Sequence, residues 1–312
     1  MYSVLDTNVY RGLSDGDLAL IQKQERQSSV VALTCTGVTL ELLASVADVT
    51  SPTFMSSWRA LRRLAVHCTS YDGSMHVLRT VLPIRQQLLV AVLGRIPDAI
   101  REEFDLLGRI VGEVIERPNA EDLHDLSPLL DHTRQIVTHR EQQFQDALFH
   151  GIVRHVIPGA TTWDAIARDT AAKRGLLAAL TGYDLVRLAA EAIVDSVADA
   201  STPINAISRS LLIDSLVTDF RVPLSLHANA IVSVVRDGTN MNKGQNANTI
   251  WDIEIAASVS ANVRIRGVPT LLVTNDRAIL NASQELALEK TFVTPDAYRR
   301  QLETRDFLDV RT

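Results

Sequence analysis

Cysteine, excess positive charge and long apolar runs are all scarce in this sequence of 312 residues. Its two cysteines, Cys35 and Cys68, have no spacing that indicates zinc, and we expect both to be buried free thiols. Because cysteine is scarce and the chain does not open on an apolar leader, we expect a cytoplasmic protein. The most apolar stretches, such as residues 88–93, are too short to cross a bilayer, so we expect no membrane contact.

The charge balance is acidic, with a formal net charge of -6. A protein that coats nucleic acid through bulk electrostatics has an excess of basic side chains, so this class is not favoured. Carboxylates that hold a metal ion also count as negative, and the bound ion would reverse the local sign. The hydrophobic share is 46% and no segment is of low complexity, which indicates a globular chain with a large core.

The two ends of the sequence alternate between strand and helix patterns. Strands are predicted at short apolar runs: residues 2–5, 30–33 and 270–273. Helices are predicted where apolar residues share one face: residues 38–46, 251–263 and 276–289. This alternation is typical of a parallel sheet covered by helices.

The middle of the chain contains almost no strand pattern, and prolines separate its long amphipathic stretches. We therefore predict one α/β domain formed by residues 1–50 and 225–312, interrupted by an all-helical insertion at residues 51–224. A polar run at residues 237–249 is rich in glycine and asparagine, which favour open backbone. It is either a surface connection or a loop that faces a substrate.

Four acids fall at related positions in these elements. Asp6 and Asp276 each follow a predicted strand, and the carboxyl ends of parallel strands meet at one edge of a sheet. Glu41 and Asp252 lie in the first turns of predicted helices that reach the same edge. Converging carboxylates suit a hard cation such as Mg²⁺ or Mn²⁺, which can activate water and neutralise a phosphodiester. A single acid after a strand, such as Asp276, is also a common helix cap.

The segments around these acids resemble the motifs of PIN-domain nucleases. Residues 4–8, Val-Leu-Asp-Thr-Asn, are similar to the first motif, and residues 38–43 to the helix that carries the second acid. Residues 252–257, Asp-Ile-Glu-Ile-Ala-Ala, resemble the third motif, and residues 272–276, Leu-Val-Thr-Asn-Asp, the fourth. All four occur in the family's order, although the spacing between the second and third acids is much longer than in a compact member.

The resemblance implies a three-layer fold with a central parallel sheet and a metal-dependent endoribonuclease. It implies four ligands for one or two Mg²⁺ or Mn²⁺ ions: Asp6, Glu41, Asp252 and Asp276. Asn8 and Thr274 would support the site by hydrogen bonding, although helix capping explains them equally well. Glu254 competes with Asp252 as the third ligand, but two positions along a helix it should point away by about 200°.

Substrate contacts are predicted from basic residues. Arg59, Arg62 and Arg63 share one face of a predicted helix, as phosphate-binding side chains would, and Lys243 lies in the polar run. We expect RNA as the partner, with DNA as the alternative. The chain is much larger than a compact toxin, which favours an RNA-processing or defence enzyme. An antitoxin, another protein partner and a homo-oligomer are all compatible with the sequence.

Two other functions fit parts of the pattern. A haloacid-dehalogenase-type phosphotransferase also begins with an acid after its first strand, but needs a second Asp two residues later, where this chain has Asn8. A catalytically weak PIN-like module could bind nucleic acid or protein without cleavage. That version predicts a missing acid, and all four acids are present.

Overall fold

The computed structural model describes seven ranges of the chain: residues 1–72, 75–148, 169–181, 184–197, 204–237, 248–259 and 270–305. The chain forms two compact units. The first consists of Met1–Val137 together with Glu254–Thr312, and the second of Thr138–Ile253. The two ends of the sequence therefore fold together in the first unit.

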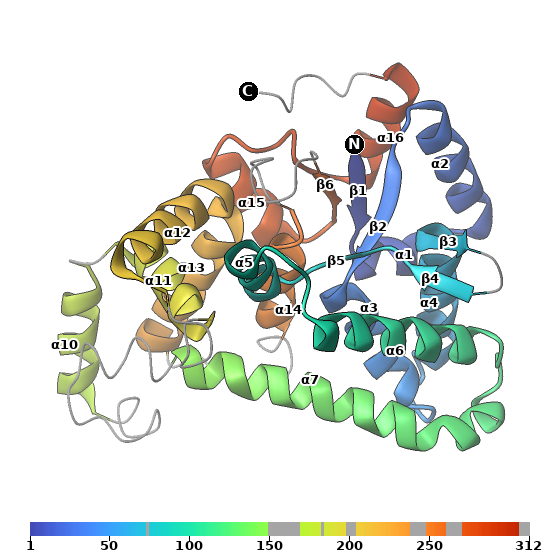
Figure 1. Cartoon of the computed structure of the whole chain (residues 1–312), viewed down its shortest axis with the longest axis horizontal. Helices are drawn as coiled ribbons and strands as arrows, with labels where there is room; N and C mark the ends of the chain where they lie inside the picture. The colour runs from blue at the N-terminus through green and yellow to red at the C-terminus, as the bar shows by residue number, and fades with distance from the viewer. Residues whose placement is uncertain are drawn as a thin grey trace. The chain divides into compact units, whose positions relative to one another are not determined.

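A five-stranded parallel sheet forms the centre of the first unit (Figure 1). Its strands are, in spatial order, β5 (Thr80–Val81), β2 (Val31–Cys35), β1 (Tyr2–Leu5), β6 (Thr270–Val273) and β7 (Phe292–Val293). In the register of the central strands, Val4 lies between Leu33 and Leu272. All residues of β6 are buried, as expected for a strand covered on both faces. The predicted α/β class with a parallel sheet is confirmed.

The direction of the strand order reverses at β1. From β1 the chain passes to β2 and then to β5 on one side, whereas β6 and β7 lie on the other side. In open α/β sheets such a reversal leaves a crevice outside the carboxyl ends of the two strands, where ligands bind. The boundary between β1 and β6 is therefore the place in this sheet to search for a site.

The described helices of the first unit precede or follow its strands along the chain. They are α1 (Thr7–Gly12), α2 (Asp15–Gln27), α3 (Thr36–Ala47), α4 (Phe54–Cys68), α5 (Ile84–Leu93), α6 (Asp98–Ile115), the 3₁₀-helix η1 (Ala120–Leu126), α15 (Arg277–Glu285) and α16 (Pro295–Thr304). Ser14 and Asp17 form a reciprocal capping box at the start of α2. Thr294 caps α16, and Pro295 occupies its first turn. These local signals fix where the two helices begin, and α2 and α16 lie side by side (Figure 1).

The segment predicted to be all-helical contains three strands, so that prediction is wrong in part. β3 (Thr69–Asp72) pairs with β4 (Met75–Leu78) as an antiparallel hairpin, and β5 extends the main sheet by pairing with β2. After this hairpin and β5, the predicted helical insertion becomes helical again only at Ile84, after Pro83. Strands of two to four residues are too short to establish an alternating pattern, and pairing with a neighbouring strand decides their conformation.

The described residues of the second unit are helical. Among these residues, the helices that lie wholly within the unit are α10 (Thr170–Thr181), α11 (Leu185–Val197), α12 (Ala206–Asp219) and α13 (Arg221–Asp237). Arg209 of α12 donates to both carboxylate oxygens of Asp195 in α11, at 2.7 and 2.8 Å. Two further helices, α7 (Ser127–Leu148) and α14 (Asn248–Ala256), contain residues of both units. In the part of the chain described, none of the helices is long and apolar enough to span a membrane.

Candidate acidic site at the carboxyl edge of the sheet

Asp6 follows the last residue of β1 and is the N-cap of α1. Its backbone N–H donates to the carbonyl of Val273, the last residue of β6, at 3.0 Å. The residue is only 3% exposed. The first acid predicted from the sequence therefore lies at the boundary between β1 and β6, where the strand order reverses.

Three donors hold the Asp6 carboxylate. The backbone N–H of Thr7 donates to Oδ1, while the Asn8 side-chain amide and the Thr274 hydroxyl donate to Oδ2 at 2.8 and 2.6 Å. Thr274 in turn accepts from the N–H of Asp276 at 2.9 Å, which fixes the direction of its hydroxyl proton. Asn8 and Thr274, both predicted as supporting residues, thus contact the same carboxylate oxygen.

Asp276 lies at the start of α15, just beyond the end of β6. Its Oδ1 accepts from the N–H of Ile279 at 2.9 Å, so Asp276 is the helix cap that the alternative interpretation expected. Capping does not remove it from the edge, because its charge is near enough to raise the pKa of Asp6. Asp276 therefore serves α15 and also contributes negative charge to the edge.

Glu41, in the second turn of α3, is joined to α1. Thr7 donates its hydroxyl to Oε2 of Glu41 at 2.7 Å, and Arg11 lies 3.5 Å from Oε1. Arg11 also donates to Ser45, one turn further along α3. The residues of α1 thus reach both Asp6 and Glu41, and this short helix connects two of the predicted acids.

Burial and neighbouring charges at this edge make the ionised forms of Asp6 and Glu41 unfavourable. Burial is the largest effect on Asp6 and raises its pKa from 3.8 to about 6, even though hydrogen bonds from Thr274 and Thr7 oppose the rise. The charges of Glu41 and Asp276 raise the pKa further. Burial also raises the pKa of Glu41, against the effects of Thr7 and Arg11. We refer to Asp6, Glu41 and Asp276 as the acidic edge.

The remaining predicted acid lies on α14. Asp252 is half-buried and belongs to the second unit, whereas Glu254 of the same helix belongs to the first. Glu254 lies next to the start of α3: a Cβ atom added to Gly37 would be 3.6 Å from its Cβ atom. The first unit by itself therefore contains three of the four predicted acids and, in addition, Glu254.

The predicted substrate-binding arginines all lie on α4, as expected from their spacing. Arg59 and Arg62 are exposed. Arg63 is mostly buried and donates to Asp15 at 2.8 Å and to the carbonyl of Tyr10 at 3.4 Å. Arg63 is therefore engaged within the fold, and Arg59 and Arg62 are the two that present guanidinium groups to solvent. Lys243 and most of the polar run at residues 237–249 lie outside the described residues.

The acidic edge has the donor chemistry of a site for a hard cation. It offers carboxylate and hydroxyl oxygens, and the described contacts of the buried Asp6 include no lysine, arginine or histidine. An ionised, buried carboxylate without a cationic partner is unfavourable, and a divalent cation would compensate it. Within the described residues, however, no three acidic, histidine or cysteine side chains are arranged as a ready set of metal ligands. The carboxylates instead accept hydrogen bonds from their own neighbours.

Two contributors to the edge were not predicted from the sequence. Thr7 contacts both Asp6 and Glu41, and Arg11 contacts Glu41. Thr7 immediately follows the first acid, so its position was a usable signal. Nothing local marks Arg11, because its contact depends on how α1 packs against α3.

Comparison of the chain with protein-family models, curated proteins and solved structures found no match.

Proposed function

We propose that this chain is a Mg²⁺- or Mn²⁺-dependent nuclease that hydrolyses phosphodiester bonds in RNA and has a PIN-like fold. The observation that carries the proposal is Asp6: it is buried at the boundary where the strand order reverses, has no cationic partner among its described contacts, and is flanked by Glu41 and Asp276. The order of the four sequence motifs supports the same function.

Asp6, Glu41 and Asp276 would hold the cation, together with an acid from α14. When bound, the ion would activate water and neutralise the charge of the phosphodiester. Thr274 and Asn8 orient the Asp6 carboxylate by donating to one oxygen. Thr7 sets the distance between the first two acids because it donates to both of them, and Arg11 offsets part of the charge of Glu41.

A second candidate function is a module that binds nucleic acid or protein without cleaving it. The observation that favours it is that Glu41 and Asp6 accept hydrogen bonds from hydroxyl and amide donors, and that the described residues contain no ready set of metal ligands. The phosphotransferase alternative has less support, because Asn8 donates to Asp6 where that class needs a second carboxylic acid.

The test is cleavage of labelled single-stranded RNA, with labelled DNA in parallel, in Mg²⁺, Mn²⁺ or chelator. We expect cleavage of RNA with either cation and none with chelator. Removing a metal ligand costs at least as much as the roughly 10- to 100-fold seen for its hydrogen-bond partners, so Asp6→Asn and Asp276→Asn should each lose about 100-fold or more.

Asp98→Asn is the matched control, because Asp98 is an exposed acid in the first turn of α6. Its activity should equal that of the wild type. Cleavage that survives chelator and both edge substitutions would contradict the proposal. Cation-dependent binding of RNA without any cleavage would instead favour the binding module.

A further inference from the structure

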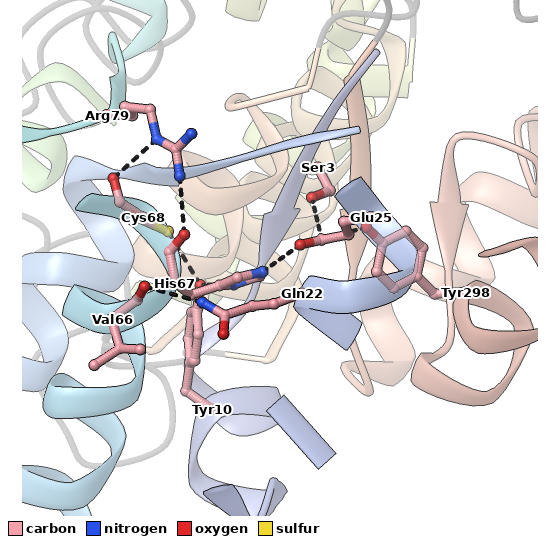
Figure 2. Close-up of polar contacts among 9 residues, drawn as sticks. All are labelled: Ser3, Tyr10, Gln22, Glu25, Val66, His67, Cys68, Arg79 and Tyr298. Atoms are coloured by element: carbon pink, nitrogen blue, oxygen red, sulfur yellow. Dashed lines mark hydrogen bonds and ion pairs between the residues drawn. The ribbon is translucent and has the colours of Figure 1, made fainter. Parts of the chain in front are cut away.

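A second group of polar side chains, which shares no residue with the acidic edge, lies inside the first unit (Figure 2). Its members are at most 3% exposed and come from five elements: Ser3 of β1, Tyr10 of α1, Glu25 of α2, His67 and Cys68 of α4, and Tyr298 of α16. We call these six residues the Glu25 cluster. Burying so many polar groups is costly unless each finds a partner.

Each polar group of the Glu25 cluster has a partner. Glu25 receives hydrogen bonds from Ser3 at 3.0 Å and from Tyr298 at 2.5 Å on one oxygen. Its other oxygen lies 2.7 Å from Nε2 of His67. The opposite ring nitrogen of His67, Nδ1, lies 2.9 Å from the hydroxyl of Tyr10, which is also 3.3 Å from the sulfur of Cys68. The contacts therefore run without a break from α16 through Glu25 and His67 to α1.

The central pair of the cluster is charged. Burial alone would lower the pKa of His67, but the charge of Glu25 and the hydrogen bonds of Cys68 and Glu25 raise it to about 10. Burial would raise the pKa of Glu25, but His67, Tyr298 and Ser3 together lower it. With both groups charged, the pair holds its geometry more tightly than a neutral hydrogen bond would.

The end of α4 that carries His67 is held in place as well. Arg79 donates to the carbonyls of His67 and Cys68 at 3.0 and 3.2 Å, and Gln22 donates to the carbonyl of Val66 at 3.0 Å (Figure 2). The last carbonyls of a helix have no partners within the helix, so these side chains stabilise its final turn. His67 is thus a fixed point against which Tyr10 is placed.

Helix α1 depends on such a fixed point. It has six residues, and a helix of this length is not stable without tertiary contacts. Of these six, Thr7, Val9 and Tyr10 are buried, and Tyr10 makes the polar contacts with α4. The same helix carries Thr7, Asn8 and Arg11, which contact the carboxylates of the acidic edge.

We propose that Tyr10, held by the His67–Glu25 pair, positions α1 and through it sets the geometry of Thr7 and Asn8 at the acidic edge. Tyr10, His67 and Glu25 are then positioning residues. Tyr298 touches the same carboxylate but lies on α16, which carries none of the edge residues. Its hydroxyl should contribute to stability without setting the geometry of α1. The consequence for cation binding rests on the proposed function, whereas the consequence for α1 itself does not.

The experiment compares Tyr10→Phe with Tyr298→Phe, since each removes one buried hydroxyl from the cluster and keeps the ring. Hydrogen exchange is measured at the amides of Val9, Tyr10 and Leu13, which bond to carbonyls of Asp6 and Val9. We expect these amides to exchange at least about tenfold faster in Tyr10→Phe and within about twofold of wild type in Tyr298→Phe. Urea denaturation measures the free energy of unfolding of both variants. If these free energies differ, hydrogen exchange is compared at urea concentrations that make them equal.

The second measurement is the dissociation constant of Mn²⁺ by titration calorimetry. We expect Tyr10→Phe to weaken binding by about fivefold to tenfold and Tyr298→Phe to leave it unchanged. Equal acceleration of exchange in both variants, or none in Tyr10→Phe, would overturn the positioning role. If the wild type binds neither Mn²⁺ nor Mg²⁺, the proposed function fails, and hydrogen exchange still decides the role of Tyr10.

Discussion

Replacing Glu25 by glutamine removes the negative charge beside His67 while nearly preserving the shape of the side chain. The amide oxygen can still accept from Ser3 and Tyr298, and the amide nitrogen faces Nε2 of His67, 2.7 Å from the oxygen that it replaces. Without the carboxylate, burial is the dominant effect on His67 and favours its neutral form. The substitution therefore tests the charged pair rather than the packing around it.

The magnitude follows from the pKa of His67. Its rise from 6.5 to about 10 corresponds to about 5 kcal/mol of preference for the charged form, at about 1.4 kcal/mol per pH unit. Because the folded value lies above the unfolded one, this contribution is complete below pH 6.5 and is lost as the pH rises through about 10. It amounts to about 4 kcal/mol at pH 7 and less than about 1 kcal/mol at pH 10.

Glu25→Gln should therefore lower the free energy of unfolding by about 3 kcal/mol at pH 7, after about 1 kcal/mol is allowed for the neutral hydrogen bond that replaces the ion pair. At pH 10 the loss should shrink to about 1 kcal/mol or less. Besides Glu25, the groups that contact His67 include Tyr10, Cys68 and Arg79, and they are the same in both proteins. Glu25 is one cause of the raised pKa of Tyr10 and of Tyr298, but burial is the largest cause and persists in the variant, so both hydroxyls stay neutral up to pH 10 in either folded protein.

The assay is urea denaturation of wild type and variant between pH 7 and pH 10, followed by tryptophan fluorescence, to which the buried Trp58 contributes, and by circular dichroism. Tyr298→Phe provides the control, since it removes a hydrogen bond to Glu25 and leaves the charge, so its loss of about 1 kcal/mol should change by less than about 0.5 kcal/mol up to pH 10. A loss in Glu25→Gln that is the same at pH 7 and pH 10 would refute the charged pair.

Two further predictions concern the acidic edge and the arginines of α4. Because the pKa of Asp6 is raised to about 6, its ionisation destabilises the metal-free fold as the pH rises through that value, and its protonation competes with a cation. Titration calorimetry should show Mn²⁺ affinity falling by up to about tenfold per pH unit below pH 6 and level above pH 7; an affinity independent of pH would exclude Asp6 as a ligand. Arg62→Ala should weaken binding of labelled RNA in chelator, measured by anisotropy, and change stability by less than about 0.5 kcal/mol, because Arg62 is exposed. Arg63→Ala should instead cost about 1 kcal/mol in urea denaturation, because it loses its bonds to Asp15 and to Tyr10; equal effects of both substitutions on both measurements would contradict this division.

The sequence predicted those elements of the fold whose hydrophobic patterns are long or fully buried. Three such predictions are confirmed: the strands at residues 2–5 and 270–273 and the helix around residues 38–46. Consecutive apolar residues indicate a buried strand, and periodic ones indicate a helix with one buried face. The hairpin β3–β4 and strand β5 were not predicted. Their residues carry no distinctive alternation, and backbone pairing with distant or neighbouring segments determines them.

The sequence could place some residues of the candidate site but not others. Asp6 and Asp276 follow adjacent parallel strands, so topology alone brings them to one edge. The position of Glu41 beside Asp6 depends in addition on the packing of α3 against α1, which the sequence does not show. The position of the acids on α14 could not be predicted either, because this helix contains residues of both units. The Glu25 cluster left no local signal, because Glu25 and His67 are 42 positions apart and lie on different helices.

Among the described residues of the first unit, the buried carboxylates Glu25 and Asp6 show why burial by itself does not identify a functional acid. Both are 3% exposed, and in both cases burial is the largest effect and raises the pKa. In Glu25 the neighbouring His67 more than compensates and lowers the pKa, so the charge is neutralised within the fold. In Asp6 the charges of the acids Glu41 and Asp276 raise the pKa further. A carboxylate whose counter-charge is supplied by its own fold has a structural role, whereas one beside further acids is neutralised either by a proton or by a cation from solution. This contrast is the physical reason for assigning the proposed metal site to Asp6 and the positioning role to Glu25.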